Sequence, residues 1–140
     1  MKTWVHIIFS MVVAAILYQI FGWKAGFILV SGVLIDADHY LWFVVKRKNF
    51  NLFECYRFIA IESDKIKYKN FAGEVMVFHT IEFLLLMVLL SFFNEIALIF
   101  TIGLAGHYLL DIIWYIFGMK GFILNHSLLW WLYRNKIQKF

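Results

Sequence analysis

The sequence predicts an all-α, polytopic membrane protein: a four-helix transmembrane bundle with an interfacial segment in the 46–71 loop and a short interfacial C-terminal helix. Composition is the first observation, because 64% of the residues are hydrophobic and only 16% are charged, against about 45–50% and 25% in soluble domains. The second is that neither proline nor a Ser- or Gly-rich linker breaks the long apolar runs. The length of 140 residues suits one domain, and we predict a single membrane-embedded domain over residues 1–140.

The first two spans are predicted at residues 4–21 and 25–45. The first begins like a signal peptide, but no small-x-small cleavage site follows its apolar part, so we interpret it as a retained helix. The second follows the short connection 22–24. It offers about twenty apolar positions, which cross the hydrocarbon core at 1.5 Å per residue.

The one long polar segment of the chain, residues 46–71, comes next. Residues 50–59 within it could form an interfacial helix. Two further spans are predicted at 74–93 and 96–117, joined by a tight connection. The aromatic stretch 122–133 is too short to span and is predicted to lie at the interface.

Positive charge sets the predicted orientation. All Lys and Arg except Lys24 fall in the N-terminus, the 46–71 loop or the C-terminal tail, which four spans place on one side. The positive-inside rule then puts both termini in the cytoplasm of a multi-pass inner-membrane protein. The basic residues lie beside apolar spans, so anionic lipid headgroups rather than nucleic acid are the expected partner. The single cysteine, Cys55, cannot form an internal disulfide.

Acids and imidazoles inside the predicted spans are the candidate functional groups, because an ionised group at the bilayer centre is costly and marks a site by default. At 1.5 Å per residue they all lie about 7–15 Å from the cytoplasmic end of their helices, with His6 close to the same surface. Three pairs have the i,i+3 or i,i+4 spacing that places both members on one helix face. These pairs are Asp36 with His39, His79 with Glu82, and His107 with Asp111. Asp38 would point about 160° away from Asp36 on a regular helix, so either the helix unwinds there, or Asp38 binds a second metal or orients a ligand from outside the site.

Imidazoles and carboxylates without a thiolate suit zinc, with iron or manganese as alternatives, and the set could hold one or two ions. A metal would also supply the positive charge that the buried acids lack. The alternative for each histidine is a hydrogen bond between helices. His126, in the tail, could cap the site or hydrogen-bond at the interface.

The order of these motifs resembles the membrane-bound metal-dependent hydrolases, small inner-membrane relatives of zinc-dependent phospholipase C. The motifs are an early His6, the Asp36-Ala37-Asp38-His39 segment, His79-Thr80, and Gly106-His107 followed by Asp111. The resemblance implies hydrolysis of a phosphoester with a divalent metal. A membrane-embedded site that opens to the cytoplasmic leaflet favours a lipid substrate, such as a phospholipid or polyprenyl phosphate. The resemblance also implies metal ligands at six positions and a proton acceptor at Asp38 or Glu82. The ligands are His6, Asp36, His39, His79, His107 and Asp111.

Two other classes of function fit the same residues. A transporter or proton relay would use the acids and histidines to carry an ion, although polar groups are scarce in the predicted outer half. A non-catalytic membrane partner would use the polar layer as glue between helices. An oligomer is compatible with each alternative.

Overall fold

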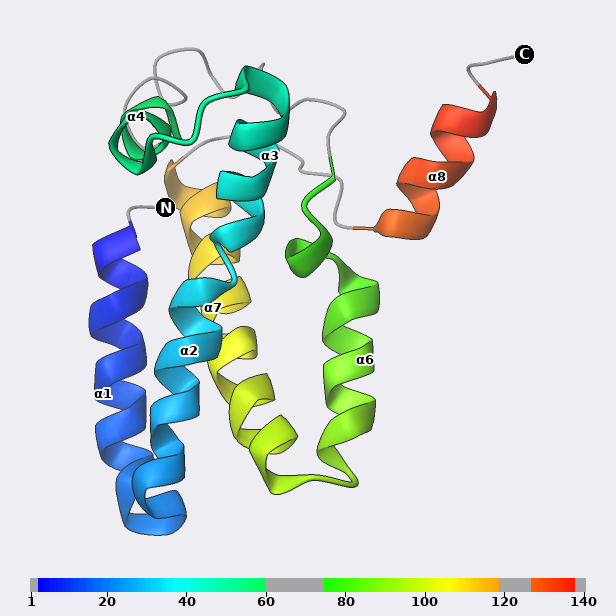
Figure 1. Cartoon of the computed structure of the whole chain (residues 1–140). Helices are drawn as coiled ribbons and strands as arrows, with labels where there is room; N and C mark the ends of the chain where they lie inside the picture. The colour runs from blue at the N-terminus through cyan, green and yellow to red at the C-terminus, as the bar shows by residue number, and fades with distance from the viewer. Residues whose placement is uncertain (1–2, 60–74, 119–126, 138–140) are drawn as a thin grey trace. The chain divides into compact units, whose positions relative to one another are not determined.

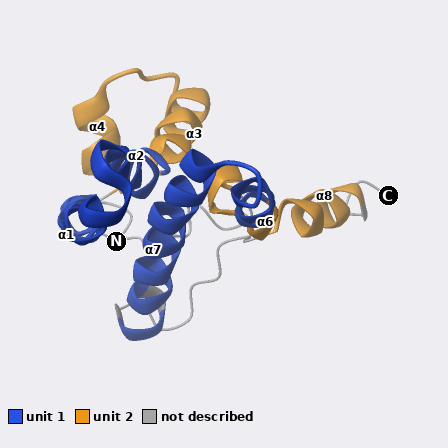
Figure 2. Ribbon diagram, turned by 90° about the horizontal axis from the view of Figure 1, so that it is seen from below, with its two compact units in different colours: residues 1–35, 83–121 blue, residues 36–82, 122–140 orange. Residues whose placement is uncertain are grey.

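The computed structural model describes residues 3–59, 75–118 and 127–137, and every regular element in these ranges is helical (Figure 1). The all-α prediction is confirmed for them. The chain divides into two compact units, which Figure 2 colours separately. Unit 1 comprises Met1–Ile35 and Phe83–Gly121, and unit 2 comprises Asp36–Glu82 and Phe122–Phe140.

Unit 1 is built from α1 (Thr3–Phe21), the 3-10 turn η1 (Gly22–Ala25), α2 (Gly26–Leu34), α7 (Glu95–Gly118) and most of α6 (Ile81–Ser91). α2 packs against both α1 and α7. The reversal between α1 and α2 is made by Gly22, whose φ of 56° lies in the left-handed region that glycine adopts without a steric cost. Lys24 in this turn forms an ion pair with Glu95 at the start of α7.

Small residues allow the helices of unit 1 to approach closely. A Cβ on Gly103 of α7 would lie 2.6 Å from the carbonyl oxygen of Ile28 in α2. A Cβ on Gly32 of α2 would lie 2.0 Å from Oγ of Ser10 in α1. Such packing is typical of membrane helices, where close van der Waals contact replaces the hydrophobic effect as the force between helices.

Aliphatic side chains from α1, η1, α2 and α7 form the core of unit 1. Ala14, Ala25, Ile28 and Ile99 are buried together. α6 joins this unit through a short turn in which the side chain of Asn94 accepts hydrogen bonds from the backbone N–H groups of the first turn of α7. This N-cap ends the turn and starts α7.

Unit 2 contains α3 (Ala37–Arg47), α4 (Leu52–Arg57), the 3-10 turn η4 (Val77–His79) and α8 (Leu128–Ile137). Aromatic packing joins α3 to α4, with the rings of Phe43 and Phe58 5.8 Å apart and the Arg47 guanidinium 4.5 Å above the Phe58 ring. Asn51 caps the N-terminus of α4 through the N–H groups of Phe53 and Glu54.

Two of the predicted spans match continuous helices, and two do not. Residues 4–21 and 96–117 correspond to α1 and α7. The predicted helix 25–45 is interrupted after Leu34 and restarts at Ala37. The predicted helix 74–93 is reduced to α6, because Met76 and Thr80 on either side of η4 have extended backbones. The 11 residues of α6 span about 16 Å, roughly half of the hydrocarbon core.

Two stretches are long and apolar enough to cross a membrane, Thr3–Arg47 and Glu95–Trp114. Only 17% and 33% of their most apolar windows are buried, whereas the core helix of a soluble protein is mostly buried. The helix predicted at 50–59 is present as α4, and the predicted C-terminal helix is present as α8. Most of the basic loop, residues 60–74, and His126 lie outside the described residues.

Candidate metal centres

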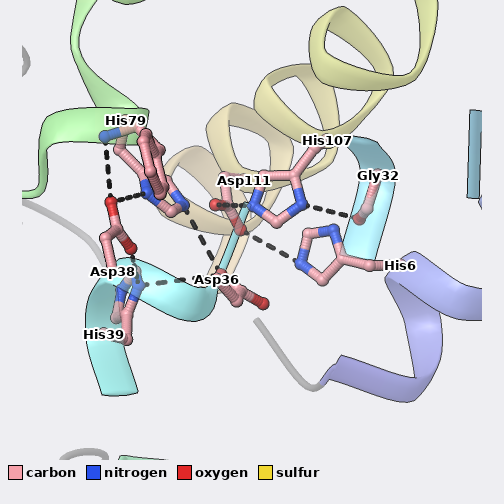
Figure 3. Close-up of polar contacts among 9 residues, drawn as sticks. His6, Gly32, Asp36, Asp38, His39, His79, His107 and Asp111 are labelled. Carbon is pink, nitrogen blue, oxygen red and sulfur yellow. Dashed lines mark hydrogen bonds and ion pairs between the residues drawn. The ribbon is translucent and has the colours of Figure 1, made fainter. Parts of the chain in front are cut away.

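Three predicted ligands meet in unit 1, and we call His6, His107 and Asp111 the α1–α7 cluster. Nε2 of His107 lies 3.3 Å from Oδ2 of Asp111, and Nε2 of His6 lies 3.4 Å from Oδ1 of the same carboxylate. Both imidazoles are 1% exposed. The predicted pairing of His107 with Asp111 on one face of α7 is therefore present, and His6 reaches it from α1 (Figure 3).

A backbone carbonyl fixes the tautomer of His107. Its Nδ1 lies 2.9 Å from the carbonyl oxygen of Gly32 (Figure 3). A carbonyl oxygen only accepts hydrogen bonds, so Nδ1 carries a proton, and in the neutral ring Nε2 has the lone pair. Nε2 of His107 faces a carboxylate oxygen of Asp111, so either a second proton on the ring or a metal ion between the two atoms would make this contact favourable.

His6 completes this cluster and has an unusual environment for a buried group. Its ring stacks on that of His107, with centroids 4.0 Å apart. Nδ1 of His6 is buried and has no hydrogen-bond partner among the residues that the structure describes. A buried polar atom left in this way is costly and requires an explanation such as an ion or a catalytic role.

The other predicted ligands meet in unit 2, and we call Asp36, Asp38, His39 and His79 the α3–η4 cluster. Nε2 of His79 lies 3.5 Å from Oδ1 of Asp36. Nδ1 of His39 lies 3.7 Å from the same oxygen, so the side chains of the predicted i,i+3 pair, Asp36 and His39, lie on the same side. η4 brings His79 into this cluster, with its ring edge-on to that of His39 at 4.7 Å between centroids.

The helix unwinds before Asp38, which is one of the alternatives predicted for this residue. Asp38 is buried inside the α3–η4 cluster, where Oδ1 lies 2.8 Å from Nδ1 of His39 and Oδ2 lies 3.0 Å from Nδ1 of His79. This position follows from the helix interruption, since Asp36 is the residue before α3 and not part of a continuous helix with Asp38. The 100° rotation per residue therefore does not apply across this pair.

Apart from the 3.7 Å between Nδ1 of His39 and Oδ1 of Asp36, the nitrogen–oxygen distances in the two clusters fall into two groups. The contacts of Nδ1 with Gly32 and with Asp38 are 2.8–3.0 Å, as in ordinary hydrogen bonds. The contacts of Nε2 with carboxylates are 3.3–3.5 Å, longer than the 2.7–2.9 Å typical of a charge-assisted hydrogen bond. Two ligands of a tetrahedral ion at about 2.0–2.2 Å lie about 3.3–3.5 Å apart. His6, His107 and Asp111 could hold a metal ion, and their Nε2–carboxylate distances have this spacing. Asp38, His39 and His79 also lie close enough together for an ion, but their contacts have the lengths of hydrogen bonds.

Glu82 is not among these groups and contacts α8 instead. Its carboxylate accepts hydrogen bonds from the Ser127 hydroxyl at 2.6 Å and from the backbone N–H groups of Leu128 and Leu129 at 3.0 and 3.1 Å. Ser127 in turn accepts from the N–H of Trp130. The carboxylate thus satisfies donors that α8 cannot satisfy internally. The predicted pairing of Glu82 with His79 is absent because the extended backbone of Thr80 separates η4 from α6.

Sequence reasoning missed the groups that orient the histidines. The Gly32 carbonyl and the backbone N–H of Phe78, which donates to Asp38 at 3.1 Å, carry no side-chain signal. The only hint was that Gly32 and Gly106 lie close to the polar residues, as small residues at tight helix contacts do.

Comparison of the chain with protein-family models, with curated proteins and with solved structures finds no match. The geometry of the two clusters is therefore the basis for any functional conclusion.

Proposed function

We propose that this protein is a multi-pass membrane protein that binds a divalent metal, zinc in the first instance, and hydrolyses a phosphoester of a membrane lipid. In this proposal the chain forms a four-helix bundle in the inner membrane, both termini are cytoplasmic, and the substrate enters from the cytoplasmic leaflet. The resemblance of the motif order to membrane-bound metal-dependent hydrolases supports the reaction class. The single observation that carries the metal is the 3.3 Å separation between Nε2 of His107 and Oδ2 of Asp111.

The hydrogen bond of His107 to the Gly32 carbonyl supports this interpretation. Because Nδ1 donates to the Gly32 carbonyl, Nε2 is the nitrogen that can bind a metal, as in metal sites whose histidines donate their other N–H to a backbone carbonyl. The donor set also fits, since imidazole and carboxylate are ordinary zinc ligands. Manganese and iron accept the same set.

Exposed apolar side chains support the placement in a membrane. On α1, Ile16 and Ile20 are 66% and 71% exposed, and α6 and α7 carry further exposed leucines and isoleucines. Apolar surface of this extent would be unfavourable in water, but it matches the acyl chains of a bilayer.

A phosphate-bearing headgroup is the substrate that the surface charge favours. Lys46, Arg47 and Lys48 are exposed at the end of α3, next to the exposed aromatic residues Phe50 and Phe53. Basic residues beside aromatic ones are typical of segments that contact anionic headgroups. These cations would attract the lipid phosphate.

The residues have distinct roles in the proposed reaction. His6, His107 and Asp111 would hold one metal ion in unit 1, and Asp36, His39 and His79 would provide ligands for an ion in unit 2. The metal, when bound, supplies Lewis-acid polarisation of the phosphoryl oxygen and activation of water. The helices around the clusters limit the access of bulk water, which strengthens each electrostatic contact.

The first experiment is elemental analysis of the detergent-purified protein. We expect stoichiometric zinc, manganese or iron in the wild type, loss of the metal in His107→Ala, and retention in the control Glu95→Gln. Glu95 is an acid on the same helix whose partner is Lys24. Metal-free wild type after purification in metal-supplemented buffer would contradict the proposal.

The second experiment measures release of the headgroup from mixed micelles: inorganic phosphate from phosphatidic acid or a polyprenyl phosphate, and glycerol phosphate from phosphatidylglycerol. Release by the wild type, lost after chelation and restored by zinc, would support hydrolysis. Bound metal without release from any of these lipids would contradict it and favour the transport alternative, which metal uptake into proteoliposomes then tests.

A further inference from the structure

Asp38 contacts three N–H groups of the protein. Its Oδ2 accepts from the backbone N–H of Phe78 at 3.1 Å and lies 3.0 Å from Nδ1 of His79, while its Oδ1 lies 2.8 Å from Nδ1 of His39. A carboxylate has about four lone-pair positions, so three of them are engaged by protein groups. Asp38 is also buried, which makes each of these bonds stronger than it would be in water.

These contacts fix the tautomers of two histidines. A carboxylate oxygen only accepts, so the nitrogen that faces it carries the proton. In His79 Nδ1 therefore carries a proton, and Nε2 faces Oδ1 of Asp36, 3.5 Å away (Figure 3). A metal ion bound between these two atoms would take the place of a proton on Nε2. The contact with Asp38 likewise places a proton on Nδ1 of His39.

We propose that Asp38 is a positioning residue of the α3–η4 cluster, which orients His79 so that Nε2 of His79 and the carboxylate of Asp36 bind the metal. This inference rests on the proposed function and changes the role of Asp38 from proton acceptor to orienting group. A proton acceptor needs a lone pair directed at the water that it deprotonates. The lone pairs of Asp38 are instead directed at three N–H groups of the protein.

The backbone contact with Phe78 strengthens the assignment. A metal ligand and a backbone N–H would compete for the same oxygen, Oδ2, and the N–H is held there by η4, in which the N–H of His79 bonds to the carbonyl of Met76. Asp38 therefore links the beginning of α3 to η4. Carboxylate–histidine–metal arrangements of this kind are the usual way to set ring orientation at a metal site.

The test compares Asp38→Asn with Asp36→Asn. Asparagine at position 38 keeps one accepting oxygen but replaces the other with an NH₂ group, which donates to an imidazole nitrogen and so moves that ring's proton to Nε2. We expect metal affinity to fall about 10–100-fold in Asp38→Asn, and by more than this in Asp36→Asn, which removes a ligand. Only Asp38→Asn should change the tautomer, because Asp36 faces Nε2 of His79 and an amide there can donate to the existing lone pair.

Nitrogen-15 NMR of histidine-labelled, metal-free protein in detergent reads the tautomer directly, with His79→Gln used to assign the signal. We expect Nδ1–H for His79 in the wild type and in Asp36→Asn, and Nε2–H for His79 or His39 in Asp38→Asn. Glu54→Gln, a change of an acid on α4 that pairs with Arg57, should alter neither tautomer nor metal affinity.

Three results would overturn the inference. The first is an Nε2–H tautomer of His79 in the wild type, which needs no variant to fold. The second is unchanged tautomers in a folded Asp38→Asn. The third is metal affinity of Asp38→Asn within threefold of wild type. The tautomer is measured in metal-free protein. Its result therefore tests the role of Asp38 independently of the proposal that the wild type binds a metal.

Discussion

The α1–α7 cluster and the α3–η4 cluster use the same chemistry but orient their histidines differently. In the first, a backbone carbonyl holds His107, and the one carboxylate of Asp111 faces two imidazoles. In the second, the side chain of Asp38 holds two imidazoles, and a separate carboxylate, Asp36, faces Nε2. A backbone group cannot be removed by substitution, so the first cluster depends on helix packing, whereas the second depends on one side chain.

The two clusters also differ in the length of the helices that carry them. The α1–α7 cluster lies on long helices whose contacts are set by glycine and serine, including Gly32 against Ser10. The α3–η4 cluster lies at the start of α3 and on a single 3-10 turn. Short elements have fewer internal hydrogen bonds to fix their backbone. Orientation by a side-chain carboxylate compensates for this in unit 2.

Loss of the shared carboxylate should have the largest effect. We expect Asp111→Asn to reduce metal affinity more than about 100-fold, beyond the 10–100-fold typical of an outer partner, because both His6 and His107 face it. His39→Ala should cost about tenfold, since His39 is partly exposed and 3.7 Å from Asp36. Competition titration with a chromophoric chelator measures both. An equal loss in the two variants would contradict the difference between the clusters.

Helix packing should be the next most sensitive feature. Gly103→Ala introduces a Cβ 2.6 Å from the backbone oxygen of Ile28, which cannot rotate away. We expect it to lower the free energy of unfolding by about 1–3 kcal/mol and the unfolding midpoint in detergent by about 3–10 °C, with weaker metal binding because α2 carries Gly32. Gly26→Ala is the control, because nothing lies within 4 Å of its Cβ. Equal midpoints for the two variants would refute the close approach.

Glu82 should affect α8 and not the metal. In Glu82→Gln we expect metal affinity within twofold of wild type, and amide exchange at Leu128 and Leu129 about fivefold faster, as for the loss of a helix cap worth ~1 kcal/mol. Hydrogen exchange with mass spectrometry measures the second quantity. A large loss of bound metal in Glu82→Gln would instead show that Glu82 belongs to the metal site, as its i,i+3 spacing from His79 predicts.

Alkylation of Cys55 tests whether the interior of the α3–α4 part of unit 2 excludes solvent. Cys55 is 4% exposed, and burial raises the pKa of its thiol to about 11. Only the thiolate reacts with iodoacetamide, so at pH 8 we expect alkylation at least about 100-fold slower than in denatured chain. The rate should rise with pH until about pH 11. Labelling at pH 8 within tenfold of the denatured rate would show that this interior is open.

Sequence alone determined the features that depend on neighbours in the chain. The pairs Asp36 with His39 and His107 with Asp111 follow from helical periodicity, and the structure places both pairs on a common face. The helices at 4–21 and 96–117 follow from apolar runs of sufficient length. These predictions succeeded because a helix is held by local hydrogen bonds.

Tertiary structure decided how these residues combine. It brought His6 to Asp111, placed Asp38 against His79, moved Glu82 to the start of α8, and shortened the helix predicted at 74–93. Each outcome depends on a partner far along the chain or on a local break in a helix, and neither is encoded in spacing. The tautomers of His79 and His107 depend on the same distant partners, so the lone pairs that can bind a metal were fixed only when the chain folded.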